Sequence, residues 1–418
     1  MRLTILCPHF APDVAPTGEV MTSIAAELVE LGHDLHVVTS LPWYQHHALE
    51  PGWDGRLVRH ETTDWGRITR VHPFPTDKRN IPARAMAFGG FTLLTTLEGL
   101  VDRTRPDLVL AMSPPLTLGP AGWAVARARR VPFVFNIQDV FPDVAIELGL
   151  LANPAAIAVA SQLERISYRS ADAVTVLSDE LADNVRAKIT KGLGGARAEH
   201  QASKVRVIPN FVDTAWIAPG PTQNSYRDEY GLGDRTVVMY AGNVGLSQSL
   251  DLVVGAAAAM ADDPDVVFVI NGGGAARPDL ERRAAGLDNL VFVDMQPKAR
   301  LPEVLAAADL HVVPLKRGLA RSSVPSKLYS ILAAGRPILA SVDDGTEVAR
   351  TIERAGAGRS VPPDDPDAFT SALRAMLADP ARRAAEGAAA RRFVEGWASP
   401  AAVAQAYHAL FCELTGRP

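Results

Sequence analysis

One polar segment carries the side chains best suited to bind a phosphorylated ligand. It follows an apolar run that ends at Pro314, and it contains two cations, Arg321 and Lys327. It also contains the serines Ser322, Ser323 and Ser326. Serine hydroxyls cap free N–H groups at a helix start, and cations form charge-assisted hydrogen bonds with phosphate oxygens. The segment therefore predicts a diphosphate cradle, with a solvated basic loop that caps a helix as the alternative.

Three glycine turns follow predicted strands, where the N-terminus of the next helix attracts phosphate. They are Thr17-Gly18-Glu19, Gly242-Asn243-Val244-Gly245 and Gly272-Gly273-Gly274. The second turn is expected to lead into a helix that begins near Ser247 and Gln248. Each turn alone is equally compatible with a tight strand-to-helix connection. The chain has no Walker motif and no complete G-x-G-x-x-G after the first strand, which argues against an NTPase or a dehydrogenase.

The elements that position these loops are short apolar runs alternating with helical patterns. This alternation predicts an α/β fold of two doubly wound, Rossmann-like domains facing each other across a cleft. Strands are expected at 3–7, 35–39, 108–112, 133–137, 173–177, 205–208, 237–241, 266–271, 290–293, 310–314 and 337–340. A first helix is expected at 19–31. A stretch rich in Pro, Gly and Asn, running from about 209 to 224, marks the domain boundary.

Composition limits the classes of protein that remain. The chain has 418 residues, 47% of them hydrophobic and 21% charged, so it is long enough for two or three globular domains. The net charge of -5 argues against a nucleic-acid ligand. Two cysteines, Cys7 and Cys412, provide neither a zinc site nor a disulfide framework. The apolar run before Pro8 is too short for a secretory signal, which predicts a cytoplasmic protein.

The segment 78–100 mixes basic residues with apolar and aromatic ones. Basic residues attract anionic lipid and aromatic side chains enter the membrane interface, so the segment could form a peripheral membrane contact. A helix packed on the domain core is an equal alternative, and Gly89-Gly90 weakens any single-helix interpretation. The histidines His9, His33, His46 and His47 show no metal-ligand spacing and are expected at the surface.

Along nearly its whole length the chain resembles glycosyltransferase family 4, whose members have the GT-B fold, and within it the colanic-acid and exopolysaccharide type. The motifs that carry the resemblance are Gly18, Leu31-Gly32-His33, Gln138-Asp139-Val140-Phe141-Pro142, Pro209-Asn210-Phe211-Val212-Asp213, Gly242-Asn243-Val244-Gly245 with Gln248, and Val324-Pro325-Ser326-Lys327. Together and in this order they are specific.

The resemblance implies two domains with different ligands. Residues 1–212, completed by a C-terminal helix at about 398–418, would bind a glycan or lipid-linked glycan acceptor. Residues 213–397 would bind a nucleotide-diphosphate sugar. Transfer in the family retains the anomeric configuration and needs no divalent metal, so no cofactor is expected beyond the nucleotide-sugar co-substrate. Such an enzyme would serve polysaccharide biosynthesis for the cell envelope, at the inner face of the membrane.

The resemblance also implies roles for individual residues. The diphosphate would be bound by Gly18, Gly242, Asn243, Gly245, Gln248, Arg321 and Lys327. The donor sugar and ribose would be bound by Ser322, Ser323, Ser326 and Ser330, and the nucleobase by Gly272, Met295 and Gln296. Gln138 would contact a sugar hydroxyl and Asp139 would orient the mid-domain loop, with a turn cap as the alternative for Asp139.

The sequence departs from the family pattern at several places, one of which is Thr17-Gly18, where the family has a pair of glycines. Ser322 and Ser330 replace two glutamates, Asn243 and Gln248 replace two cations, and Gln138 replaces a histidine. Arg317, Arg321 and Lys327 must then carry the positive charge of the diphosphate site. The lost glutamates leave a non-catalytic nucleotide-sugar-binding or scaffold protein as an alternative. A nucleotide-sugar epimerase or a glycan phosphorylase on the same fold is the alternative enzyme.

Overall fold

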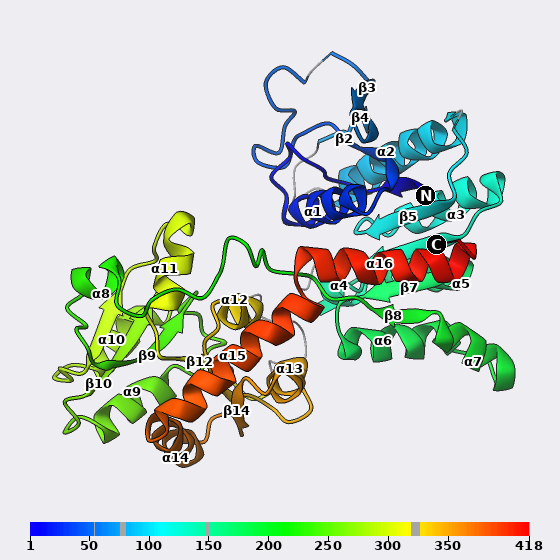
Figure 1. Cartoon of the computed structure of the whole chain (residues 1–418). Coiled ribbons are helices and arrows are strands. Elements are labelled where there is room, and N and C mark those ends of the chain that lie inside the picture. The colour runs from blue at the N-terminus through cyan, green and yellow to red at the C-terminus, as the bar shows by residue number, and fades with distance from the viewer. Residues whose placement is uncertain (54, 76–80, 103, 148–150, 319–326, 418) are drawn as a thin grey trace. The chain divides into compact units, whose positions relative to one another are not determined.

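The computed structural model describes the chain except for residues 54, 76–80, 103, 148–150, 319–326 and 418. It divides into two compact units (Figure 1). Unit 1 comprises Met1–Asn210 and Val403–Pro418, and unit 2 comprises Phe211–Ala402. The chain therefore leaves unit 1 once, builds unit 2, and returns to unit 1 with its last helix.

Unit 1 contains an eight-stranded sheet in the order β3-β4-β2-β1-β5-β6-β7-β8. The strands are β1 (Arg2–Leu6), β2 (Asp34–Ser40), β3 (Val58–Thr63), β4 (Gly66–Val71), β5 (Leu108–Ser113), β6 (Phe133–Ile137), β7 (Ala173–Val176) and β8 (Val205–Val207). All neighbours are parallel except β3 and β4, which form an antiparallel hairpin at one edge. Each strand predicted for this half overlaps an observed strand, but the β3–β4 hairpin was missed.

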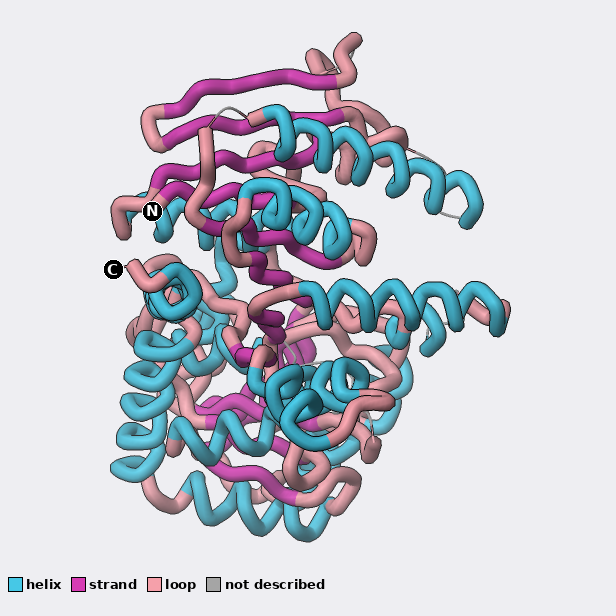
Figure 2. Tube along the Cα trace, turned by 90° about the vertical axis from the view of Figure 1, so that its right-hand side faces the viewer, coloured by secondary structure: helices cyan, strands magenta, loops and turns pink. Residues whose placement is uncertain are grey.

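Helices cover both faces of this sheet (Figure 2). They are α1 (Pro16–Glu30), α2 (Ile81–Val101), α3 (Leu118–Arg129), α4 (Asp143–Glu147), α5 (Pro154–Ser170), α6 (Asp179–Thr190), α7 (Gly195–Ser203) and α16 (Pro400–Thr415). Helix α1 begins three residues before the predicted start because Pro16, whose φ suits a helix, occupies its first position. Helix α16 is fixed to unit 1 by Tyr407, whose hydroxyl accepts a 2.8 Å hydrogen bond from the Asn136 amide of β6.

Unit 2 contains a parallel six-stranded sheet in the order β11-β10-β9-β12-β13-β14. The strands are β9 (Thr236–Ala241), β10 (Val266–Asn271), β11 (Leu290–Val293), β12 (Leu310–Pro314), β13 (Ile338–Ser341) and β14 (Gly358–Val361). The helices are α8 (Ser225–Glu229), α9 (Asp251–Ala259), α10 (Arg277–Arg283), α11 (Leu301–Ala306), α12 (Lys327–Ala333), α13 (Glu347–Ala355), α14 (Pro366–Leu377) and α15 (Pro380–Trp397). The short polar edge strand β14 was not predicted.

Strands β5 and β10 are buried along their whole length. A parallel sheet covered by helices on both faces needs apolar side chains on both sides of each strand. This explains why these strands appear in the sequence as continuous apolar runs. The edge strand β3 instead has the sequence VRHETT, with half-exposed and exposed positions, which hides it from a search for apolar runs.

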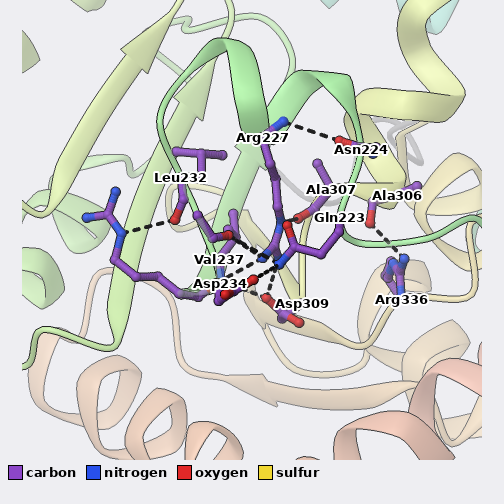
Figure 3. Close-up of polar contacts among 12 residues, drawn as sticks. Gln223, Asn224, Arg227, Leu232, Asp234, Val237, Ala306, Ala307, Asp309 and Arg336 are labelled. Atoms are coloured by element: carbon purple, nitrogen blue, oxygen red, sulfur yellow. Dashed lines mark hydrogen bonds and ion pairs between the residues drawn. The ribbon is translucent and has the colours of Figure 1, made fainter.

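A buried arginine joins helix α8 to two loops of unit 2 (Figure 3). Arg227 on α8 donates hydrogen bonds to the carbonyl oxygens of Gly233, Arg235 and Ala307 and forms a 2.6 Å ion pair with Asp309. The Asp309 carboxylate also accepts a 2.8 Å bond from the Val237 N–H at the start of β9. Because nearly all of its donors have acceptors within unit 2, Arg227 is a structural cation.

Helix α2 exposes apolar side chains on one face. Phe91 is buried against the core, whereas Met86, Leu93, Leu97 and Val101 are 47–73% exposed. Spacings of four and seven residues place these four side chains on the same side of a helix. Among the described residues, the structure contains no helix whose length and apolar character would let it cross a bilayer.

Candidate active site

Two glycine loops meet backbone to backbone at the carboxyl edge of the unit 2 sheet. Gly242 follows β9 and Gly272 follows β10, with φ angles of +144° and +153°. A Cβ on Gly272 would lie 1.9 Å from the Gly242 carbonyl oxygen, and one on Gly274 would lie 2.3 Å from the Val244 oxygen. The contact therefore requires glycine at positions 272 and 274. Bonds of 2.9 Å from Gly242 N–H to the Asn271 oxygen and 2.8 Å from Val244 N–H to the Gly273 oxygen lock the loops together.

Lys327, the first residue of α12, lies over this loop pair. Its ammonium group donates hydrogen bonds of 3.1 Å to the Tyr240 hydroxyl and 3.1 Å to the Gln248 Oε1, and it lies 4.3 Å from the Tyr240 ring centroid. Burial lowers the pKa of Lys327 to about 8. The Tyr240 hydroxyl and the Gln248 amide are both neutral, so the site holds a cation whose charge these two groups do not neutralise.

Tyr240 fixes this arrangement from below. Its hydroxyl donates a 2.5 Å hydrogen bond to the Asn243 carbonyl oxygen, while its own oxygen accepts from Lys327. Burial raises its pKa, which keeps the phenol protonated as a donor. The sequence signal for Tyr240 is a polar tip at the end of an otherwise apolar strand, two residues before the glycine turn; that signal was missed.

The glycine turn after β9 does not open directly into a helix. Gln248 instead forms an isolated antiparallel bridge with Leu315. The Ser249 and Lys316 N–H groups add hydrogen bonds of 3.2 and 3.1 Å between the two segments, and α9 begins only at Asp251. The expected helix start near Ser247 was therefore wrong, because the backbone of residues 247–249 pairs with the backbone of residues 314–316.

The segment after β12 is only partly within the described chain. Arg321, Ser322, Ser323 and Ser326 lie outside the described residues, and Ser330 is half-buried on α12. Arg317 lies beside β14, where its guanidinium donates to the Pro363 carbonyl and its N–H donates to Asp364 at 3.0 Å. Arg317 is thus held by the segment that follows β14.

The residues predicted to bind a nucleobase lie beside the ends of β10 and β11. Met295 is 55% exposed. The Gln296 side chain donates 3.0 Å to the Tyr230 hydroxyl and accepts 2.9 Å from Arg300. Arg277 donates 2.8 Å to the Gly272 carbonyl oxygen. The side-chain amide of Gln296 is therefore engaged with protein groups.

In unit 1, Gly18 lies in the first turn of α1, where a Cβ would lie 2.9 Å from the His9 Cβ. His9 accordingly packs close to α1, and its Nδ1 lies 2.6 Å from the Asp13 carboxylate. The His9 ring also stacks against Trp43, with centroids 5.7 Å apart. The expectation of a surface role for His9 was wrong, and so was that for His33, which is buried against His408.

Gln138 lies directly after β6, in a chain of amide hydrogen bonds. Its Nε2 donates 2.9 Å to Asn136, and its Oε1 accepts 2.9 Å from Asn210. Asn136 in turn donates to Tyr407 and to Thr175. Gln138 is 7% exposed, so this network ties both ends of its amide to the protein. The partners Asn136 and Tyr407 are 271 residues apart and left no local sequence signal.

Asp139 follows Gln138 and differs from it in its surroundings. The residue is exposed, yet enough protein surrounds its carboxylate to raise its pKa through desolvation.

Of the predicted diphosphate residues, the structure brings Gly242, Asn243, Gln248 and Lys327 together in unit 2, with Gly245 in the same loop. Gly18, Gln138 and Asp139 belong to unit 1.

Two Rossmann-like units, one with a cationic glycine-loop site at its carboxyl edge, define the class of GT-B proteins. The family comparison agrees. Residues 17–210 match the "Glycosyl transferase 4-like domain" and residues 235–379 match "Glycosyl transferases group 1". The chain belongs to the GT4 glycosyltransferase family, whose members use nucleotide-sugar donors. It is a glycosyltransferase with the GT-B fold.

Two curated relatives cover nearly the whole chain. The putative colanic acid biosynthesis glycosyl transferase WcaI of Escherichia coli K12 is 26% identical over 389 residues, or 90% of this chain and 92% of the relative. A D-inositol 3-phosphate glycosyltransferase of Kineococcus radiotolerans is 27% identical over 426 residues, covering 95% and 92%.

Solved structures share the fold at lower identity. Sucrose-phosphate synthase of Thermosynechococcus elongatus superposes with a TM-score of 0.65 and 18% identity, covering 100% of this chain and 99% of that one. HepE of Anabaena, solved in complex with UDP-glucose, gives 0.59 and 14%, covering 99% and 100%.

The glycine contact yields a prediction with a matched control. Gly272→Ala should lower the free energy of unfolding by about 2 kcal/mol or more, because the new Cβ strains the backbone and meets the Gly242 oxygen. Gly273→Ala should be nearly neutral, since a Cβ there has nothing within 4 Å. Urea unfolding of both variants measures the difference, and equal midpoints would mean that the loops are not held in this contact.

Proposed function

We propose that the chain is a retaining, metal-independent glycosyltransferase. It would transfer a sugar from a nucleotide-diphosphate donor, bound by unit 2, to a glycan or lipid-linked glycan acceptor, bound by unit 1. The observation that carries this proposal is Lys327, a cation held by the neutral oxygens of Tyr240 and Gln248 over a glycine turn. A site of this kind lacks an anion, and a diphosphate supplies one.

The chemistry requires stabilisation of the leaving group. When the bond between the anomeric carbon and the phosphate oxygen breaks, negative charge accumulates on the diphosphate, and a preorganised cation lowers the energy of that state. The acceptor oxygen forms the new bond to the anomeric carbon, and its proton passes to the leaving phosphate. Lys327 would therefore supply charge that a divalent metal supplies in other enzymes, with Arg321 as a second proposed cation.

The remaining predicted residues have binding roles in this proposal. Gly245 and Asn243 contribute backbone groups to the diphosphate, and Ser322, Ser323, Ser326 and Ser330 contact the donor sugar and ribose. Gly272, Met295 and Gln296 form the base site, where backbone groups carry the recognition because the Gln296 amide is engaged. Gln138 holds the sugar side of unit 1 in place, and Asp139 orients the adjoining loop.

One relative supports a proposal for the setting of the reaction. WcaI is named for colanic acid biosynthesis, which supports a role in polysaccharide synthesis for the cell envelope. We propose a cytoplasmic enzyme that contacts the lipid surface at the inner face of the membrane. The exposed stripe of Met86, Leu93, Leu97 and Val101 on α2 is the surface that supports this contact.

The membrane contact is measured by sedimentation with vesicles of anionic phospholipid. We expect the protein to sediment with the vesicles, and the double variant Leu93→Glu with Leu97→Glu to reduce the bound fraction several-fold. Trp216→Glu, which changes an exposed apolar residue of unit 2, serves as the control. Full recovery of the unaltered protein in the supernatant would exclude the stripe as a lipid-binding surface.

The transferase activity is tested by donor turnover. Incubation with UDP-, GDP-, dTDP- and ADP-sugars in excess EDTA should release the nucleoside diphosphate from one class, slowly without acceptor and faster with it. Loss of turnover in EDTA with recovery on Mg²⁺ or Mn²⁺ would overturn metal independence. Nucleotide binding without turnover of any donor would favour a non-catalytic sugar-nucleotide-binding protein.

The role of Lys327 is tested by binding of the nucleoside diphosphate. Lys327→Met should weaken the affinity about 10- to 150-fold, the worth of a charge-assisted hydrogen bond. Arg359→Ala, which removes a cation at the start of the edge strand β14, should leave it unchanged. Equal affinities of Lys327→Met and the unaltered protein would remove Lys327 from the site.

The same assay has a pH dependence. The pKa of Lys327 lies at about 8 in the free protein, so the ammonium form predominates below pH 8 and the neutral amine above it. Because only the ammonium form attracts phosphate, affinity should be level below pH 8 and fall by up to tenfold per pH unit above it. Lys327→Arg keeps its charge and should give a level profile to pH 9.5.

A further inference from the structure

Two arginines face each other across the β3–β4 hairpin at the edge of the unit 1 sheet. Arg59 and Arg70 are direct register partners. Side chains at directly opposite positions share a face of the sheet, and like charges placed there destabilise it. The hairpin therefore carries an electrostatic cost that something else must offset.

The protein offsets this cost only in part. Among the ion pairs of the described residues, Glu61 is the one carboxylate that reaches either arginine, at 3.0 Å from Arg70 and 3.6 Å from Arg59. Arg70 is 2% exposed and donates a second bond of 2.6 Å to the Ala11 carbonyl oxygen. Its buried Nη1 has no acceptor within the described part of the chain. A buried donor and an excess of positive charge are both costly when nothing completes them.

An aromatic ring holds the two guanidinium groups in place. They lie 4.4 Å (Arg59) and 5.1 Å (Arg70) from the Trp53 ring centroid. The ring stabilises cations on its face and limits their motion, so that less conformational entropy is lost when a ligand binds. Trp53 is therefore a positioning residue for Arg59.

Trp53 and Arg59 border a pocket. Its volume is about 330 Å³, and it is lined by Leu41, Gly52, Trp53, Arg56 and Arg59. This volume lies at the lower end of the range for small-molecule sites, about 300–1,000 Å³. Leu41 follows β2 directly, so the pocket opens at the carboxyl edge of the parallel strands, where ligands of such sheets bind. The pocket thus combines a ligand-binding location with two cations in its wall.

We propose that this pocket binds an anionic group of the acceptor sugar, a carboxylate or a phosphate, through Arg56 and Arg59. A guanidinium offers two parallel N–H donors that match two oxygens of either group, and the anion offsets the repulsion between Arg59 and Arg70. The assignment of the ligand as the acceptor rests on the proposed function, whereas anion binding by the pocket does not. The acceptor is then an acidic saccharide or a sugar phosphate.

Calorimetry on the full chain tests the pocket, with saturating UDP present to occupy the unit 2 site. The probes are methyl glucuronide, glucose 6-phosphate and the neutral methyl glucoside. We expect one or both charged probes to bind at least tenfold more tightly than the neutral one, and the tighter charged probe identifies the group. Arg56→Gln and Arg59→Gln should each reduce that preference at least fivefold, and Trp53→Leu should reduce it less.

Arg127→Gln, which removes an exposed arginine from α3, is the matched control and should keep the full preference. If Arg59→Gln fails to fold, Arg56→Gln on the exposed loop decides the test alone. Equal binding of charged and neutral probes, or full preference in Arg56→Gln, would overturn the anion site. UDP binding measured on the same samples separates the two proposals, because its absence in the unaltered protein would count against a uridine-specific donor site and not against the anion site.

Discussion

The proposed donor site of unit 2 depends on one steric constraint, the direct contact between the backbones of the β9 and β10 loops. Two residues without side chains, Gly272 and Gly274, allow the β10 loop to lie against the carbonyl oxygens of Gly242 and Val244. That contact fixes the Asn243 carbonyl, which orients the Tyr240 hydroxyl, which in turn holds Lys327. A cation that is positioned before the ligand arrives needs little reorganisation when charge develops on a leaving group.

Arg227 and Lys327 of unit 2 show how a structural charge differs from a charge proposed to bind a ligand. The Arg227 guanidinium forms an ion pair with the Asp309 carboxylate and donates hydrogen bonds to three carbonyl oxygens, so its charge is neutralised within the fold. The Lys327 ammonium group donates hydrogen bonds to a hydroxyl and an amide oxygen, neither of which carries a negative charge. Burial therefore lowers the pKa of Lys327. A positive charge without a matching carboxylate is the property that a diphosphate site requires. Arg59 and Arg70, beside Trp53 in unit 1, also carry more positive charge than their shared partner Glu61 balances.

The sequence predicted the features that depend on local pattern. Continuous apolar runs located the central strands, because a sheet buried on both faces leaves no alternation, and the turn at 242–245 located the site loop. It missed the half-exposed hairpin strand β3, which carries Arg59, and placed a helix start at Ser247 that pairing with β12 moves to Asp251. These outcomes depend on contacts between distant segments, which no local pattern records.

The amide network around Gln138 explains why this position need not transfer a proton. Its Oε1 accepts from Asn210, the last residue of unit 1 before the chain enters unit 2, and its Nε2 donates to Asn136, which reaches Tyr407 on the returning helix. A glutamine can link the segment that leaves unit 1 and, through Asn136, the helix that returns to it, because its amide has both a donor and an acceptor. A histidine could also donate and accept, but only as the neutral tautomer, and protonation would remove its acceptor and break one link. The position therefore favours a side chain that does not titrate, in keeping with the proposal that the acceptor proton passes to the departing phosphate.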